Sequence, residues 1–133
     1  MFFNLFKNKI KNKELSEAEK QWNRMWALWV DGKISSPYKE LMTYQSEVNN
    51  GGHLQYFDNT RNVSNLSREM SALNEVLPDE LRTNLQNAYS AYLLFDENEE
   101  NEEAEDSLEK CDDFYYKSEE KINNILESFS ETI

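Results

Sequence analysis

Carboxylates are the reactive side chains that this sequence supplies in quantity, with 26 Asp and Glu residues against 14 Lys and Arg residues. The chain has one histidine, His53, and one cysteine, Cys111. A Ser-His-Asp triad needs bonded partners around its histidine, and a structural zinc site needs several His or Cys ligands. Because the sequence offers no second histidine, no cysteine pair and no glycine-rich phosphate loop, it predicts no catalytic residue, no metal site and no cofactor.

The densest group of carboxylates lies in residues 96–106, where eight of 11 positions are Asp or Glu. The run lacks the glycine and the regular Asp spacing of an EF-hand calcium loop. As a helix it would carry one charge per about 2 Å of axis, close to the ~1.7 Å of duplex DNA. Like-charged pairs three and four residues apart disfavour an isolated helix, so we expect a flexible acidic loop before the C-terminal helix. A solvated linker without a function is the alternative.

Charge is unevenly distributed along the chain, with +4 in residues 1–13 and −12 in residues 96–133. An acidic surface repels nucleic acid phosphates and anionic membranes, and it attracts basic proteins such as DNA-binding transcription factors. We therefore expect a basic protein as the partner and no direct binding of nucleic acid. The sequence indicates no particular oligomeric state. The candidate partner-binding residues are Asp96, Glu97, Glu99, Glu100, Glu102, Glu103, Glu105, Asp106, Asp112 and Asp113.

Residues 1–13 differ from the rest of the chain, because they combine four lysines with several apolar side chains and contain no acid. This basic amphipathic segment is expected to be a tail that frays or docks on the acidic body, or else a contact with a membrane surface or a partner. Its apolar residues precede its charges, unlike a secretory signal, and no stretch approaches the ~20 apolar residues that span a bilayer. We expect a cytoplasmic protein without integral membrane insertion.

Helical periodicity recurs along residues 14–133, and no segment shows the alternation typical of a strand. Ser16 and Glu19 have the spacing of a capping box, so a helix should start there and end near Gly32. Its apolar stripe is predicted to be core: Trp22, Met25, Trp26, Trp29 and Val30. Further helices are expected near residues 37–48, 53–59, 64–77, 78–93 and 108–129. The predicted fold is all-α, a single compact domain of about six helices.

Residues 47–59, Glu-Val-Asn-Asn-Gly-Gly-His-Leu-Gln-Tyr-Phe-Asp-Asn, resemble the E-x-N-N-G-G-x-x-Q-Y-F-x-N signature of a bacterial DNA-mimic protein family. The likeness continues through Ser71-Ala72-Leu73 and a late block from Leu108 to Tyr116, and covers about residues 22–133. The resemblance implies an all-helical protein without catalysis. It also implies an acidic surface that imitates DNA and occupies a DNA-binding protein.

The signature residues have an architectural interpretation, because glycine and asparagine end helices and amide side chains bond across turns. Direct contact with a partner is the alternative for the same positions: Glu47, Asn49, Asn50, Gly51, Gly52, Gln55, Tyr56, Phe57 and Asn59. The leading functional hypothesis is a non-enzymatic module that binds the basic surface of a DNA-binding protein. The alternatives are an immunity- or antitoxin-like inhibitor of a basic toxin, and a peripheral structural factor attached through residues 1–13.

Overall fold

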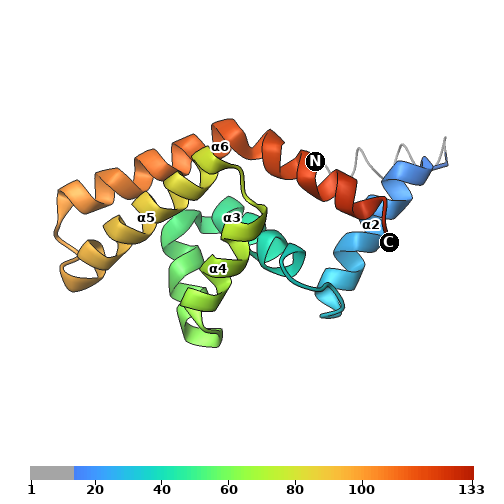
Figure 1. Ribbon diagram of the computed structural model, residues 1–133. Helices are drawn as coiled ribbons and strands as arrows, with labels where there is room; N and C mark the ends of the chain where they lie inside the picture. Colours follow the sequence, from blue (N-terminus) through green and yellow to red (C-terminus); the bar gives the residue numbers. More distant parts are fainter. Residues whose placement is uncertain (1–13) are drawn as a thin grey trace. The chain divides into compact units, whose positions relative to one another are not determined.

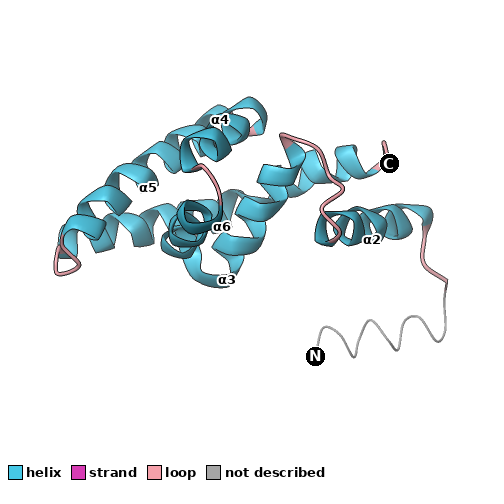
Figure 2. Cartoon of the chain, turned by 90° about the horizontal axis from the view of Figure 1, so that it is seen from below, coloured by secondary structure: helices cyan, strands magenta, loops and turns pink. Residues whose placement is uncertain are grey.

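The computed structural model describes residues 14–133, and within them it contains five α-helices and no strand (Figures 1 and 2). The all-α prediction is confirmed, whereas the predictions for residues 1–13 lie outside the described residues. One helix bends sharply in its middle, so these residues contain the six helical segments that periodicity predicts. The helices are α2 (Glu17–Val30), α3 (Tyr38–Val63), α4 (Leu66–Val76), α5 (Asp79–Glu97) and α6 (Glu102–Ser130).

The chain divides into two compact units. One unit contains α2 and residues 127–133. The other unit, Ser35–Leu126, contains α3, α4, α5 and most of α6. The family-like signature and the acidic run both lie in this second unit, so it holds the candidate site.

Helix α2 begins with the predicted capping box: Glu19 N donates to Ser16 Oγ over 3.1 Å, and Ser16 N donates to Glu19 Oε1 over 3.0 Å. Its apolar stripe is less buried than predicted, because Met25 is fully buried whereas Val30 is 75% exposed. The three tryptophans of the stripe are half-buried and pack edge to face on one another. Indole rings are large and seldom fully enclosed, so the periodicity located the face correctly and overstated its burial.

Aromatic rings from α3, α5 and α6 form a cluster within the core of the second unit. Tyr44, Tyr56, Phe57 and Tyr115 are fully buried, and Tyr92 is 2% exposed. Neighbouring rings in this cluster have centroids 5.0–5.6 Å apart, for example 5.0 Å between Phe57 and Tyr92 and 5.6 Å between Tyr44 and Tyr115. Such pairs contribute about 0.5–1.5 kcal/mol each beyond their burial, so the cluster fixes how α3 meets α5 and α6.

The sharp bend of α3 falls at Gly51 and Gly52, where the predicted break between two helices is confirmed. Gly52 has φ 75° and ψ −176°, a region that is open essentially to glycine alone. A Cβ atom at Gly52 would lie 2.5 Å from Oδ2 of Asp112, so a side chain there would displace the Asp112 carboxylate. The helical segment after the bend continues to Val63, beyond the predicted end at Asn59.

The acidic run is mostly helical, which corrects the prediction of an acidic loop over residues 96–106. Helix α5 continues to Glu97 and α6 begins at Glu102, so only residues 98–101 form the connection. Asn98 Oδ1 accepts from Glu100 N, and Asn101 Oδ1 caps α6 by accepting from Ala104 N, both over 3.0 Å. Three acids lie in the first turn of α6, where the helix dipole stabilises each by about 0.3–1 kcal/mol. That gain, together with the cap, exceeds the like-charge cost of about 0.2–0.5 kcal/mol per pair.

Helices α5 and α6 therefore form an antiparallel hairpin that ends in a four-residue turn (Figures 1 and 2). Asn84, which is buried in α5, donates from Nδ2 to the backbone oxygen of Cys111 over 2.9 Å. Near the other end of the hairpin, Lys121 donates to Glu80 and holds the pKa of that carboxyl below its usual value. These contacts fix the register in which α6 lies along α5.

We predict that Gly52→Ala destabilises the protein more than Gly32→Ala. Both glycines have positive φ, 75° and 71°, so each substitution strains the backbone. A Cβ at Gly32 meets nothing within 4 Å, whereas one at Gly52 displaces Asp112. The free energy of unfolding, measured by urea denaturation, should fall by at least about 1 kcal/mol more for Gly52→Ala, because the displaced carboxylate leaves its donors unpaired. Equal losses for the two variants would contradict the role given to Asp112.

Candidate functional site

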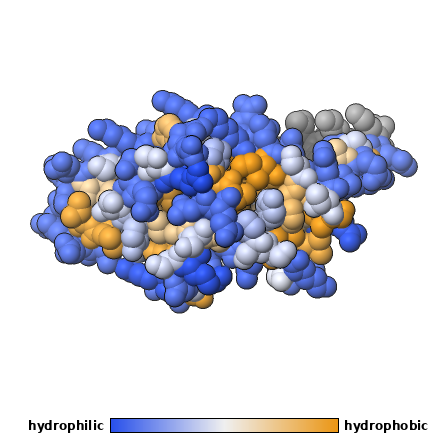
Figure 3. Space-filling view, viewed as in Figure 1, coloured by the Kyte–Doolittle hydropathy of each residue, from blue (hydrophilic) through white to orange (hydrophobic). Residues whose placement is uncertain are grey.

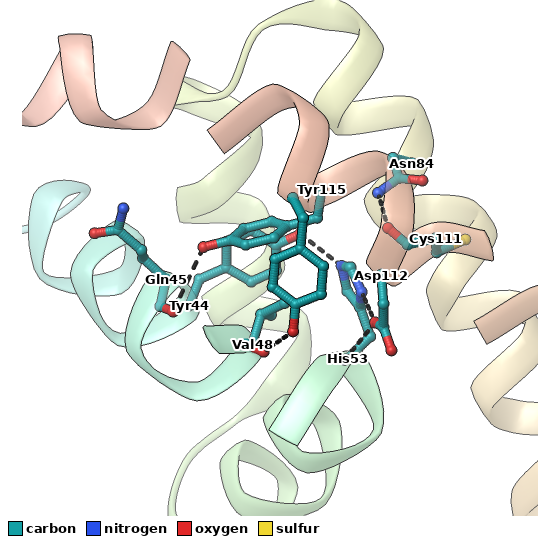
Figure 4. A network of polar contacts seen from close by, with 9 residues as sticks. Tyr44, Gln45, Val48, His53, Asn84, Cys111, Asp112 and Tyr115 are labelled. Carbon is teal, nitrogen blue, oxygen red and sulfur yellow. Dashed lines mark hydrogen bonds and ion pairs between the residues drawn. The ribbon is translucent and has the colours of Figure 1, made fainter. Parts of the chain in front are cut away.

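A buried hydrogen-bonded chain joins the bend of α3 to α6 (Figure 4). Asp112 Oδ1 lies 2.7 Å from His53 Nδ1, and His53 Nε2 lies 2.6 Å from Tyr44 Oη. A carboxylate only accepts, so His53 Nδ1 carries the hydrogen of its contact with Asp112, and Nε2 shares a hydrogen bond with the Tyr44 hydroxyl. His53 is fully buried and is the first residue after the glycine pair. The chain therefore holds the start of the second helical segment against α6.

Asp112 acts as a helix cap supplied from another part of the sequence. Its Oδ1 also accepts from the backbone N of His53 over 2.8 Å. The bend leaves the first amides of the second segment without helical acceptors, and a carboxylate there also complements the helix dipole. Asp112 was predicted as a partner-binding residue, but the structure commits its carboxylate to α3 and leaves the side chain 25% exposed.

Two tyrosines of α6 contact backbone oxygens on the N-terminal side of the bend. Tyr116 Oη donates to the backbone oxygen of Val48 over 3.0 Å, and Tyr115 Oη lies 3.5 Å from the backbone oxygen of Gln45. Both acceptors belong to the last turns before Gly51, where a bent helix has carbonyls to satisfy. Asp112, Tyr115 and Tyr116 together are called the α6 clamp below. The clamp satisfies backbone groups on both sides of the glycine pair.

The polar residues of the signature bridge the bend through side chains. Glu47 Oε1 accepts from Gln55 Nε2 over 2.7 Å and from Asn59 Nδ2 over 3.0 Å. Asn49 Nδ2 donates to Glu119 Oε2 over 2.7 Å and thereby reaches α6. The amide side chains of Gln55 and Asn59 therefore bond across the bend to the carboxylate of Glu47.

The remaining signature residues divide into core and surface. Tyr56 and Phe57 are fully buried, whereas Asn50 and Gly51 are exposed. Neither Tyr44 nor Glu119 belongs to the signature, although both complete its contacts. Helical periodicity marks a position as core, but it does not predict that a buried tyrosine will donate to a histidine nine positions later.

Tyr44 and His53 of the buried chain are shielded from solvent. Burial raises the pKa of the Tyr44 hydroxyl well above its usual value, and the ring of His53 has no exposed surface. Burial likewise raises the pKa of the Cys111 thiol, which favours the unreactive thiol over the thiolate. Within residues 14–133 no group of three or more His, Cys, Asp or Glu side chains has an arrangement able to hold a metal ion. The hydrogen bonds of His53 with Tyr44 and Asp112 link α3 to α6.

The predicted partner-binding residues gather around the α5–α6 turn. Nine of them are exposed, and they are called the acidic hairpin: Asp96, Glu97, Glu99, Glu100, Glu102, Glu103, Glu105, Asp106 and Asp113. Along α6, Glu102, Asp106, Glu109 and Asp113 follow one another at spacings of four, three and four residues. This spacing places them on one face, about 17 Å long, opposite the buried Leu108 and Cys111.

Most of the acidic hairpin is electrostatically uncompensated. Asp96 pairs with Arg61 over 2.9 Å, and this hydrogen bond raises the pKa of the guanidinium. The other eight members form no ion pair with any residue in the described part of the chain. Figure 3 shows hydrophilic surface over most of this end of the second unit, with a small apolar area among it. The hairpin thus presents a concentrated negative field to solvent.

The fold and the site define an all-helical acidic protein built around a clamped bend. The chain belongs to the family of the DMP19-like proteins, whose family model matches residues 40–132. The matched region includes both the glycine pair and the α6 clamp. Comparison with curated proteins and with solved structures found no match. Among the described residues, no helix has the length and apolar character needed to cross a membrane.

We predict that Asp112→Ala lowers the free energy of unfolding by at least about 2 kcal/mol, because two buried donors of His53 lose their acceptor at about 1–3 kcal/mol each. The exposed neighbour Asp113 provides the matched control, and Asp113→Ala should change stability by no more than about 0.5 kcal/mol. Urea denaturation followed by circular dichroism measures both. Similar values for the two variants would show that the clamp contributes little.

Stability should also fall in alkaline solution. The pKa values of Tyr44 and Tyr115 are raised in the folded protein, mainly by burial. Tyrosines in the unfolded chain ionise at about pH 10. Below that pH the folded and unfolded chains hold the same tyrosine protons, so the contribution of these residues to stability is intact. Above it only the unfolded chain releases the protons, which favours unfolding. Phenolate absorbance and circular dichroism should therefore change together above about pH 10. Tyr44→Phe should make the loss of stability with pH less steep. Full phenolate formation with helicity retained would contradict this prediction.

Proposed function

We propose that this protein is a non-enzymatic protein-binding module whose acidic hairpin occupies the basic surface of a DNA-binding protein. The observation that carries the proposal is the gathering of nine exposed carboxylates on one hairpin, eight of them without a basic partner among residues 14–133. Uncompensated charge costs stability through self-repulsion. A basic partner would turn that repulsion into attraction.

Membership in the DMP19-like family supports the same proposal, because the family takes its name from DNA mimic protein 19. The spacing of the carboxylates supports it as well. The stripe on α6 presents a charge every ~5 Å, against one phosphate per ~3.4 Å along one DNA strand, and the other hairpin carboxylates add to it. The signature residues have an architectural role in this proposal, since they hold the bend and the α6 clamp. The hairpin would supply the contacts.

An inhibitor of a basic toxin would use the same electrostatics, and competition with DNA separates the two functions. If the protein binds its partner by imitating DNA, added duplex DNA must displace the protein from that partner. A toxin that is bound through a surface unrelated to DNA would stay bound. The protein alone should not bind duplex DNA, because both surfaces are negative.

We predict that neutralising the hairpin weakens the partner complex at least about fourfold, since four exposed ion pairs contribute about 0.2–1 kcal/mol each. The test variant carries Gln at Glu99, Glu100, Glu102 and Glu103. The control carries Gln at four exposed acids elsewhere, Glu14, Glu17, Glu75 and Glu131, so both variants change the net charge from −12 to −8. The partner is recovered at low salt, purified and titrated with each form.

The control variant should bind nearly as tightly as the unmodified protein, and added salt should weaken all complexes, since the Debye length is about 8 Å at physiological ionic strength. The proposal is wrong if the hairpin variant binds as tightly as the unmodified protein. It is equally wrong if duplex DNA and this protein occupy the partner at the same time.

A further inference from the structure

A groove runs between α5 and α6 beside the acidic hairpin, with a volume of about 490 Å³. Four small side chains contribute to its lining, Ser90 and Ala91 from α5 and Ala104 and Ser107 from α6, which leaves room between the two helices. Leu94, which is 53% exposed, forms an apolar wall. Grooves of about 300–1,000 Å³ have the size of ordinary ligand sites. The groove can therefore receive a side chain from a partner.

The polar lining of the groove selects the charge of its occupant. Glu103 and Asn101 lie at the turn end, where the other hairpin carboxylates also gather. Lys110 lies farther along α6 and is the basic residue of the lining. A cation is thus attracted to the turn end and repelled from the Lys110 end. A second copy of this chain is disfavoured as the occupant, because two chains of net charge −12 repel each other.

We propose that this groove binds arginine side chains from a helix of the basic partner, in preference to lysine side chains. An arginine stem can lie along Leu94 and Ala91 while its guanidinium donates to Glu103 and the amide oxygen of Asn101. A planar guanidinium is weakly hydrated and bonds a carboxylate through two donors, whereas an ammonium is compact and strongly hydrated. A half-apolar groove with one lining carboxylate therefore favours arginine. This inference rests on the proposed function and specifies the chemistry of its partner.

Two synthetic peptides test the inference, an alanine-based helix with arginine at every fourth position and its twin with lysine at the same positions. Both peptides carry the same charge, so a surface whose affinity depends on charge alone binds them equally. Calorimetric titration at low salt should show at least about fivefold tighter binding of the arginine peptide to the unmodified protein, a preference of about 1 kcal/mol. Equal affinities for the two peptides would overturn the inference.

Filling the groove without changing its charge provides the second arm. Ser90→Leu and Ser107→Leu, made separately, place a bulky apolar side chain in the lining of the groove, and either one should reduce the preference for arginine to less than about twofold. Leu94→Ala removes the apolar wall without filling the groove and should lower the preference in the same direction. The control, Ser67→Leu with Ser71→Leu, places leucines at exposed positions of α4 and should leave the preference unchanged.

The outcomes separate this inference from the proposed function. If the filled variants keep the preference for arginine while the Gln variant of the hairpin binds both peptides more weakly, the proposed function of the acidic hairpin is supported. The groove is then not the site that favours arginine. If the Gln variant binds both peptides and the purified partner as tightly as the unmodified protein, the proposed function fails as well. Circular dichroism of every variant verifies that helicity is retained, and the three separate groove variants ensure that one folding failure does not remove the test.

Discussion

A single carboxylate, Asp112, holds the two parts of α3 in their bent arrangement. Its Oδ1 accepts from both the backbone and the ring of His53, and its Oδ2 occupies the space that a side chain at Gly52 would need. The bend brings the second half of α3 under α6, where Tyr56 and Phe57 complete the aromatic core. Without that capping carboxylate, a buried helix end would lack an acceptor, at a cost comparable to a sizeable share of the stability of a small domain.

The residues that suggested the family and the residues that suggested binding have separate places in the structure. The signature bridges the bend through Glu47, Gln55 and Asn59, and the α6 clamp closes it from the opposite helix. Most carboxylates with binding potential lie nearer the α5–α6 turn, and Asp113 is the member of the acidic hairpin that adjoins the clamp. Asp112 was grouped with the surface acids because of its position in the sequence, but its contacts belong to the bend.

Sequence reasoning located the helices well, because helix periodicity and helix ends depend on neighbouring residues. The break at Gly51 and Gly52 and the capping box at Ser16 are of this local kind. The acidic run was misjudged because repulsion between its charges was weighed without the Asn101 cap and the dipole of α6. The partner of Asp112 could not be predicted, since His53 lies 59 positions away and nothing local indicates the pairing.

The placement of clamp and carboxylates on one continuous helix limits how this chain can vary in evolution. Each residue turns an α-helix by about 100°, so a one-residue insertion between Glu102 and Asp112 would rotate the stripe well away from its outward face. Replacing one exposed residue there by another would leave the register intact. The segment between the turn and the clamp should therefore tolerate changes of residue type while keeping its length, and a length change would have to come as whole turns.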